Sequence, residues 1–430
     1  MSARAAPAAG RQAPRALFEA LFDAAVAAAD PAETIRAHLP ARPRGRTVVI
    51  GAGKAAAQMA RAFEAAWDGP LEGLVVTRYG YAADCRRIAV VEAAHPVPDA
   101  AGLDAARRLM ALVSGLGGDD LLVALVSGGG SALLPAPPPG LTLADEIAVN
   151  EALLASGAPI SAMNAVRKHV SAIKGGRLAA AAHPARVVTL VVSDVPGDDP
   201  ALVSSGPTVA DATTPADALA VVEAYGLALP ASVMAHLRSA AAAAPAPDDA
   251  RLAGNTVEVI ASAARSLEAA AVAAQAHGIE AVILSDAMEG EAREVGRVHA
   301  AIAREVALRE RPFLRPVVML SGGETTVTLA GPGGRGGRNT EFLLAFALAA
   351  EGLERVHGFA ADTDGIDGSQ SNAGAFADGA SAARMRAAGL DPRALLARHD
   401  SWGAFAAIGD LFEPGPTGTN VNDLRAVLVG

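Results

Sequence analysis

Four turns rich in glycine or aspartate carry the side chains best suited to chemistry in this 430-residue chain. Each turn follows an apolar run that predicts a buried strand. In parallel α/β sheets, ligands bind at the carboxyl ends of strands, so we expect a site at these turns. The sequence contains no G-x-x-x-x-G-K-[ST] loop, no G-x-S-x-G elbow and no H-E-x-x-H pair. A Walker-type nucleotide site, an α/β-hydrolase and a zincin therefore lack support.

The first turn, at residues 51–54, is similar to the G-x-G-x-x-G/A dinucleotide fingerprint between a strand and a helix. It predicts Gly51 and Gly53 as cofactor-binding residues. Lys54 would add an ammonium group at a helix N-terminus, where backbone N–H groups favour anions. The next strand ends at Arg78 and offers no acid for a ribose hydroxyl. A tight turn with a solvated lysine is the structural alternative.

The second turn places three consecutive glycines after a fully apolar strand. Such a backbone bends so that several N–H groups converge, which is typical of an anion nest for phosphate or carboxylate. A flexible linker is the alternative, but linkers rarely interrupt a packed strand so abruptly. We therefore predict a phosphate-binding loop formed by Ser127, Gly128, Gly129, Gly130 and Ser131.

The third turn places Asp194 directly after an apolar strand, with Asp198 and Asp199 nearby. Mg²⁺ prefers one or two carboxylates together with phosphate oxygens, so Asp194 is a predicted metal ligand. For Asp198 and Asp199, ordinary turn chemistry explains the residues equally well.

The fourth region lies in the second half of the chain, where a glycine-rich segment leads into a helix at Arg338 and Asn339. Arginine binds carboxylate or phosphate in a bidentate way, so this region suits an anionic substrate. The loop at residues 362–368 superficially resembles a calcium loop, but its spacing fails the EF-hand pattern. We predict substrate contacts from Asn339, Glu324 and Asp364, and metal ligation by Asp362 and Asp367.

A basic segment separates the second and third turns. Arg167 and Lys174 are seven positions apart and would share one face of a continuous helix. We predict that Arg167 binds substrate and that Lys174 binds the cofactor, with a solvated basic face as the alternative. His169 has no partner in view and is expected to be structural.

The elements that position these residues alternate between strand and helix, which predicts an α/β fold with a doubly wound parallel sheet. A polar, prolyl stretch at residues 240–249 predicts a boundary between a Rossmann-like domain at 1–240 and a smaller α/β domain at 250–430. Strands are expected at 47–50, 74–77, 121–126, 187–192, 257–260, 281–284, 317–320, 325–329, 356–360 and 426–429, and helices at 16–38, 54–67, 105–113, 143–155, 161–182 (broken at 175–176), 262–277, 291–309 and from about 339.

The net charge and the composition of the chain restrict the kinds of partner that it can bind. The net charge of −10 and the lack of a basic stripe argue against nucleic acid, although not against a small anion. Cys85 is the single cysteine, and no apolar run approaches the length of a membrane span. The cytoplasm is the expected location; the arginine-bearing N-terminal segment suggests either a frayed tail or a transit peptide. A homo-oligomer is compatible with the sequence but not specified by it.

Taken in order along nearly the whole chain, these segments resemble the class II glycerate kinases, whose C-terminal half is called the MOFRL domain. The matching segments are 51–54, 127–131, 164–169, 174–177, 193–198, 205–208, 321–325, 337–339 and 362–368. The resemblance implies a Rossmann-like N-terminal domain, a smaller C-terminal domain and an active site in the cleft between them. It also implies a kinase that uses ATP and Mg²⁺ to convert D-glycerate to 2-phosphoglycerate, with Lys54 and Arg338 in the key positions.

On this basis we expect the glycine-rich loop to hold ATP phosphates and Asp194 to hold Mg²⁺. Lys54 would neutralise the transferring phosphoryl group, and Arg338 would grip that group or the glycerate carboxylate. No general base is identified, although Asp194 and the loop at 362–367 are candidates. Many relatives carry the name hydroxypyruvate reductase, so an NAD(P)H-dependent reductase that uses the first turn is the rival hypothesis. A non-enzymatic anion-binding protein is a further alternative.

Overall fold

The computed structural model describes residues 9–329, 333–368 and 370–430. The chain divides into two compact units, which we call the central unit (residues 31–260) and the terminal unit (residues up to 30 together with 261–430). Each unit has its own six-stranded sheet among the described residues. The units are described separately below.

The central unit contains a sheet with the strand order β3-β2-β1-β4-β5-β6. Its pairs β1–β2, β2–β3, β1–β4 and β4–β5 are all parallel. This is the doubly wound order of dinucleotide-binding folds, and the order reverses between β1 and β4, where such folds bind their ligands. The strands are β1 (Thr47–Ala52), β2 (Glu72–Arg78), β3 (Ile88–Ala93), β4 (Leu121–Ser127), β5 (Arg186–Val192) and β6 (Thr256–Ala261).

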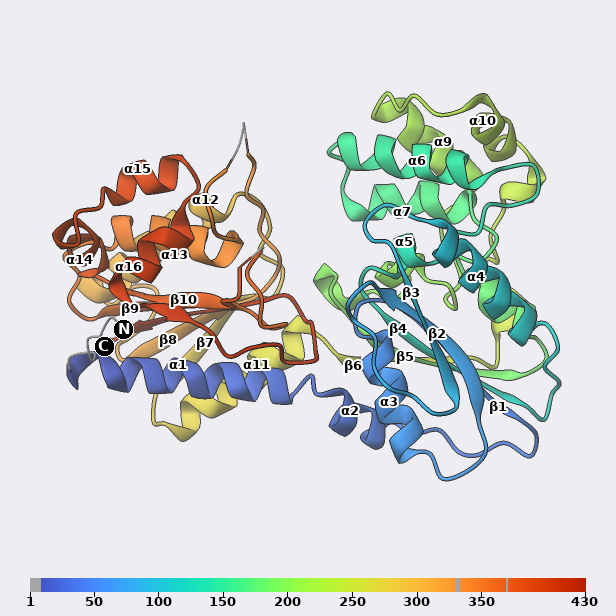
Figure 1. The fold of residues 1–430 in the computed structure, drawn as a ribbon, viewed down its shortest axis with the longest axis horizontal. Helices are drawn as coiled ribbons and strands as arrows, with labels where there is room; N and C mark the ends of the chain where they lie inside the picture. The colour runs from blue at the N-terminus through green and yellow to red at the C-terminus, as the bar shows by residue number, and fades with distance from the viewer. Residues whose placement is uncertain (1–8, 330–332, 369) are drawn as a thin grey trace. The chain divides into compact units, whose positions relative to one another are not determined.

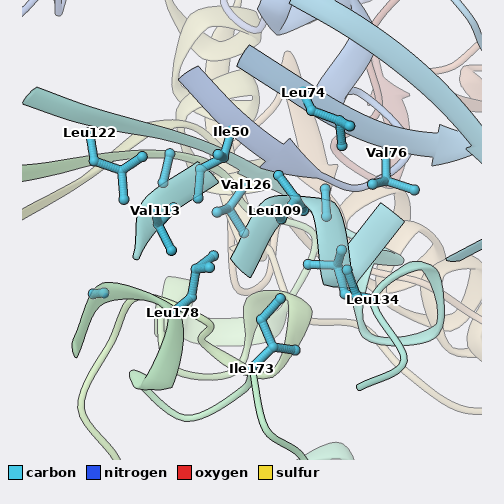
Figure 2. Packing of buried hydrophobic residues seen from close by; sticks show 14 of the residues in the cluster. Ile50, Leu74, Val76, Leu109, Val113, Leu122, Val126, Leu134, Ile173 and Leu178 are labelled. Carbon is cyan, nitrogen blue, oxygen red and sulfur yellow. The ribbon is translucent and has the colours of Figure 1, made fainter. Parts of the chain in front are cut away.

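Alternating strand residues build the main core of the central unit. Ile50 of β1 and Leu122 and Val126 of β4 point toward Leu109 and Val113 of α4, as Figure 2 shows. Because β1 and β4 are buried along their whole lengths, their sequences are continuous apolar runs, as expected for strands covered on both faces. The helices around this sheet include α2 (Pro31–Ala37), α3 (Ala56–Ala66), α4 (Ala100–Val113), α5 (Gly130–Leu133) and α8 (Arg177–Ala182).

Four further helices of the central unit form a smaller helical cluster, visible together in Figure 1. Val149 and Leu153 of α6 pack there with Val166 of α7 and Val222 of α9. This cluster positions α7, which carries Arg167 and whose Asn164 donates to the Leu202 carbonyl at 3.0 Å. Its helices are α6 (Leu143–Ala155), α7 (Ile160–His169), α9 (Pro215–Ala224) and α10 (Ala231–Leu237).

The terminal unit contains a mixed sheet with the order β11-β10-β9-β12-β8-β7. β12 is antiparallel to both β8 and β9, whereas β7 and β8 are parallel. The last strand of the chain therefore lies in the middle of the sheet. The strands are β7 (Glu280–Ser285), β8 (Val317–Ser321), β9 (Val356–Asp362), β10 (Gly374–Asp378), β11 (Leu411–Phe412) and β12 (Asp423–Val429).

The two faces of this sheet are covered by different helices. Val317 and Met319 pack with α12 and α13, whereas Val318 and Leu320 pack with α1 and α11 on the opposite face, as the period of two along a strand requires. Figure 1 shows α1 lying along α11 beneath the strands. The helices are α1 (Ala9–Ala27), α11 (Ala263–Ala276), α12 (Ala292–Arg309), α13 (Arg338–Ala349), α14 (Ser381–Ala387), α15 (Pro392–Ala397) and α16 (Ser401–Ile408).

The unit boundaries differ from the predicted division at 240–249. Strand β6 follows the prolyl stretch but joins the sheet of the central unit. Helix α1, at the other end of the chain, packs on the terminal unit through Phe18 and Phe22. Its apolar stripe predicts a buried helix, but the local sequence does not indicate which sheet the stripe covers.

Three predicted elements also differ from the structure. The helix expected over 16–38 is two helices, because Pro31 begins α2 and cannot continue the hydrogen bonding of α1. The helix expected over 161–182 is interrupted from Val170 to Gly176, with Gly175 and Gly176 both at positive φ. The segment expected as a strand at 325–329 makes only a single isolated bridge, from Thr326 to Glu291.

Candidate active site

The first two turns interlock at the carboxyl ends of β1 and β4. The N–H of Lys54 donates to the Gly128 carbonyl at 2.8 Å, and the N–H of Ala55 donates to Ser127 Oγ at 3.0 Å. Gly53 has φ 133°, and a Cβ there would lie 2.2 Å from Ser127 Oγ. The backbone donors of the first turn are therefore used within the protein, and close packing between the turns explains why a glycine stands at position 53.

Gly51 has a similar packing reason. A Cβ at this position would lie 2.4 Å from the Leu125 carbonyl oxygen of the neighbouring strand. Gly51 is thus required by the approach of β1 to β4, and its predicted contact with a cofactor stays a prediction.

At the second turn, predicted residues that follow strands β1, β4 and β5 lie close together. Gly129 adopts a left-handed conformation at φ 83°, and Gly130 begins α5. A Cβ on Gly129 would lie 3.3 Å from Lys54 Cγ, and a Cβ on Gly128 would lie 1.6 Å from Asp194 Oδ2. Lys54 and the Asp194 carboxylate therefore both lie against the glycine loop, which we define as residues 128–130.

A segment with a strained backbone, residues 204–206, contacts the turn that contains this loop. Ser204, Ser205 and Gly206 all have positive φ, at 53°, 58° and 53°. The Ser204 hydroxyl donates to the Ser127 carbonyl at 2.6 Å, and the Ser205 hydroxyl contacts Ser131 Oγ at 2.7 Å. Non-glycine residues held in this conformation cost free energy and concentrate at functional sites. In the sequence, residues 205–208 stood out only as one of the segments that carry the family resemblance.

His95 is a further residue at the loop that sequence analysis missed. Its Nε2 lies 3.2 Å from the position of a Cβ on Gly129. Burial, followed by the charges of Lys54, Arg78 and Arg167, lowers the pKa of His95 to about 4. The imidazole is therefore neutral at pH 7, and the charges of three cations act on it. A signal existed in the sequence, since His95 follows a strand end, but the short strand β3 was not predicted.

Arg167 lies near this group, as its effect on His95 indicates. Its Nε donates to Asn150 Oδ1 at 3.0 Å, and burial lowers the pKa of the guanidinium. Lys174, by contrast, is buried, and its Nζ donates to Glu146 at 2.6 Å and to the Leu134 carbonyl at 3.1 Å. The predicted shared helical face of Arg167 and Lys174 is wrong, because α7 ends between them. We therefore interpret Lys174 as a structural cation.

The terminal unit has a second polar cluster, centred on Arg338 at the start of α13. Its Nε donates to Asp423 at 2.9 Å and one terminal nitrogen donates to Asp362 at 2.6 Å. The other terminal nitrogen pairs with Glu324 at 3.0 Å. Burial alone would lower the pKa of the guanidinium, but the three carboxylates outweigh it and raise the pKa. Only Glu324 among these acids is substantially exposed, so a ligand that meets Arg338 would displace Glu324 most easily.

The acids behind Arg338 are held from the protein side. Burial, together with the nearby Asp423 charge, raises the pKa of Asp362 well above its ordinary value despite the adjacent guanidinium. Arg425 is fully buried, donates to Asp423 and also donates to the Gly322 carbonyl at 3.1 Å. Asp423 and Arg425 were missed by sequence analysis, because they lie far along the chain inside a strand that was predicted to start only at Ala426.

Three predicted residues of this cluster have structural explanations. Asp367 accepts hydrogen bonds from the N–H groups of Asn339 and Thr340, both at 2.9 Å, and so caps α13. The Asn339 amide is fully buried and donates to Asp423 at 2.8 Å. Asp364 accepts from the N–H of Ile366 at 2.8 Å in a turn typical of aspartate. Both oxygens of Asp367 accept hydrogen bonds from α13, so we interpret Asp367 as a helix cap, and its predicted metal role stays a prediction.

The arrangement of the acidic side chains also limits how Mg²⁺ could bind. Within the described residues, no group of three or more acidic, histidine or cysteine side chains is arranged to hold a metal ion. A site made only of protein ligands is therefore unsupported there. Mg²⁺ usually keeps several waters and binds through one or two carboxylates plus substrate phosphates. Asp194 beside the glycine loop fits that requirement, whereas Asp362 already bonds to Arg338.

Comparison with known proteins places both units. Residues 17–238 match a domain family of unknown function (DUF4147), and residues 317–423 match the MOFRL family. A protein of Agrobacterium vitis, named provisionally as a hydroxypyruvate reductase, is 56% identical over 97% of this chain and 94% of its own length. The glycerate 2-kinase of Pyrococcus horikoshii is 40% identical over 90% of this chain and 88% of its own length. The crystal structure of the glycerate kinase of Thermotoga maritima has a TM-score of 0.88 and 37% identity, covering 97% of this chain and all of that one.

The chain belongs to the class II glycerate kinase family. The predicted α/β fold, with a Rossmann-like sheet and a second α/β unit, is confirmed by the match to the Thermotoga maritima structure. No helix in the described part of the chain is long and apolar enough to cross a membrane. Membership of the glycerate kinase family directs attention to the two positions expected to be essential, Lys54 and Arg338, each of which lies in one of the polar clusters described above.

Proposed function

We propose that this chain is a glycerate 2-kinase, which transfers the terminal phosphoryl group of ATP to the 2-hydroxyl of D-glycerate and requires Mg²⁺. The observation that carries the proposal is the meeting of Lys54, Asp194 and the glycine loop at the point where the strand order of the central sheet reverses. A cation, a carboxylate and a left-handed glycine turn together provide charge neutralisation, a metal ligand and backbone donors. Phosphoryl transfer depends mainly on such positioning and electrostatic stabilisation.

In this proposal each side chain has one task. Lys54 compensates the negative charge of the phosphoryl group in transfer. The loop amides bind phosphate oxygens, and Asp194 is the carboxylate that would hold Mg²⁺, whose contribution is to neutralise charge on the phosphates. Arg338 and Glu324 form an exchangeable pair in the terminal unit, so an anionic group of the substrate can replace Glu324 on the guanidinium.

Two observations support the acceptor and the position of transfer. The relatives at about 40% identity that carry a curated activity name are glycerate kinases, and the Pyrococcus horikoshii protein is named for the 2-position. Glycerate is a small hydroxy acid, and its carboxylate is the kind of group that a guanidinium such as that of Arg338 binds in a bidentate way.

The test is a product assay with the purified protein, D-glycerate, Mg²⁺ and ATP, coupled to enolase without phosphoglycerate mutase. Enolase accepts 2-phosphoglycerate and not the 3-phosphate, so a signal establishes both transfer and position. Repeating the assay with mutase added detects the 3-phosphate. No phosphoglycerate in either assay would refute the kinase.

Hydroxypyruvate reductase is the second candidate, because the Agrobacterium vitis relative carries that name and the central sheet has the dinucleotide-binding strand order. Against it, the first-turn amides of Lys54 and Ala55 already donate within the protein. In addition, β2 ends at Arg78 and not at an acid that could bind a ribose hydroxyl. Oxidation of NADH or NADPH by hydroxypyruvate, with no phosphoglycerate formed, would establish the reductase instead.

A further inference from the structure

Lys54 and His95 border the glycine loop, and the charges of Arg78 and Arg167 act on His95. Of these four side chains, only Lys54 has a role in the proposal above. We propose that His95 is a direct ligand of a dianionic phosphoryl group bound at the glycine loop, together with Lys54, Arg78 and Arg167. This inference deepens the proposed function and rests on it for the origin of the phosphoryl group.

The topology brings these residues to one edge of the sheet. Arg78 ends β2 and pairs in register with Ala93, the last residue of β3. His95 follows two residues later, and Lys54 follows the neighbouring strand β1. At Gly129, the position of a Cβ would lie 3.2 Å from His95 Nε2 and 3.3 Å from Lys54 Cγ. Both side chains therefore border the same left-handed glycine, where a ligand approaches the backbone without a side chain in its way.

Two contacts orient the remaining cations without neutralising them. The Arg78 guanidinium lies over the Tyr81 ring at 4.2 Å. Arg167 donates through Nε to Asn150, whose amide nitrogen donates in turn to the Pro96 carbonyl at 3.5 Å, next to His95. Asn150 thus connects α7 to the loop that carries His95.

These cations lack the direct ion pair that the buried lysines of the central unit make, although the charge of Glu146 acts on Arg167. In the part of the chain that the structure describes, Lys54, Arg78 and Arg167 make no ion pair with a carboxylate. The buried Lys168 and Lys174 pair with Asp211 and Glu146. Cations that converge without a counter-ion are an arrangement that attracts an anion.

The charge balance favours a dianion over a carboxylate. Three permanent cations act on His95, and the carboxylate brought to the loop is that of Asp194, against Gly128. The acids nearest His95 in sequence, Glu92 and Asp99, bond instead to the Gly80 amide and the Tyr79 hydroxyl. A phosphoryl dianion balances the three cations and the Asp194 carboxylate, whereas a single carboxylate would leave one positive charge unbalanced.

A bound dianion also changes the chemistry of His95. The burial and cations that lower its pKa to about 4 keep the ring neutral while the loop is empty of anions. A dianion between the cations offsets their effect, so the ring takes up a proton and donates a charged hydrogen bond. A ring that only fills space against Gly129 would show no such response.

The test measures sulfate binding by calorimetry between pH 8 and pH 5. Sulfate stays a dianion over this range, so any change in affinity reports the protein. We expect sulfate to bind more tightly as the pH falls, and His95→Gln to weaken binding about tenfold at pH 5 and to flatten the pH dependence. His38→Gln, a change elsewhere in the central unit, is the matched control and should behave as the unmodified protein.

A second measurement keeps the proposal testable if His95→Gln misfolds. In the unmodified protein, sulfate should raise the pKa of His95 followed by imidazole NMR, and Arg78→Met should raise it without sulfate. D-glycerate in place of sulfate is the carboxylate arm. No sulfate effect on His95, or an effect of D-glycerate alone, would overturn the proposal. Neither result depends on turnover, so failure of the kinase assay and failure of this inference are distinguishable.

Discussion

At the scale of single residues, Lys54 is the side chain whose loss separates catalysis from folding most cleanly. Its aliphatic stem lies against Gly129, but its ammonium makes no ion pair among the described residues. The Lys54→Ala variant should therefore keep its stability, whereas kcat should fall roughly 100-fold or more, as when other groups that stabilise transition-state charge are removed.

The enolase-coupled assay and a thermal melt measure the two effects on the same sample. Lys174→Met is the informative comparison, because Lys174 is paired with the buried Glu146. Its loss should leave a buried carboxylate unpaired and destabilise the fold by about 3 kcal/mol or more. A Lys54→Ala enzyme that retains most of its turnover would remove Lys54 from the mechanism.

His299 is one source of acid sensitivity in the terminal unit. Burial lowers its pKa to about 4, below the value near 6.5 of an unfolded chain. Between these values the unfolded chain binds the proton and the folded chain does not. The free energy of unfolding is therefore undiminished above pH 6.5 and falls by roughly 3 kcal/mol in total as the pH drops to 4.

Urea titrations at pH 7 and pH 5 test this, with Trp402 as the fluorescent probe of the terminal unit in a Trp67→Phe background. His299→Gln should be less stable at pH 7, because the ring bonds to Ser321 at 2.8 Å, but should lose less on acidification. The exposed His277 provides the control: His277→Gln should show the pH slope of the unmodified protein. An unchanged slope in His299→Gln would contradict the assignment.

At the scale of elements, sequence analysis succeeded where a strand is buried on both faces and ends in an unusual turn. Strands β1, β4 and β5 were predicted because their apolar runs are continuous, and they carry Lys54, the glycine loop and Asp194. Helices α14 to α16 were missed because they are too short to show a helical period. Strand β3 was missed because it lies at the edge of the sheet and is only partly buried, so its sequence is not a continuous buried run. As a result His95 was missed as well.

The polar cluster around Arg338 could not be predicted, because its hydrogen bonds join segments that are far apart in the sequence. Arg338 bonds to Asp423, 85 positions away, only because β12 inserts between β8 and β9. Aspartates that cap a helix and aspartates that bind metal look alike in sequence. Asp367 and Asp194 both follow strands, and only the hydrogen bonds of the folded chain tell them apart.

Because Asp367 caps α13 and Asp194 does not, substitution of the two aspartates should have different effects. Asp367→Asn should lower stability by about 1–2 kcal/mol, because the amide replaces one of the two oxygens that cap the helix. The Mg²⁺ concentration that gives half-maximal activity should not change. Asp194→Asn should do the opposite, raising the Mg²⁺ requirement with little effect on stability.

Thermal melts and activity titrations with Mg²⁺ measure both quantities for the two variants side by side. If Asp367→Asn raises the Mg²⁺ requirement while leaving the melting temperature unchanged, our structural interpretation of Asp367 is wrong.

At the scale of the whole molecule, the first helix belongs to a unit made mostly of the last part of the chain. Phe22 of α1 is 2% exposed and meets Phe359 and Phe412 edge to face, with ring centroids 6.1 Å and 5.0 Å apart. The N-terminal segment therefore completes the core beneath β9 and β12. Folding of the terminal unit must join segments from both ends of the chain, which is a non-local contact that slows folding.

This arrangement predicts where a mutation at the N-terminus acts. Phe22→Ala should destabilise the terminal unit by about 3–5 kcal/mol, through lost burial and a cavity. Amide hydrogen exchange should accelerate in β8, β9 and β12 while the strands of the central unit stay protected, because local stability follows cooperative units. Phe63→Ala is the matched control, since Phe63 is fully buried in α3 and stacks on Trp67. It should give the reverse pattern, with faster exchange in β1 and β2 and unchanged exchange in β8 and β9. Equal acceleration in both units from either variant would mean that the chain unfolds as one cooperative body, and the division at residues 30 and 260 would then have no energetic meaning.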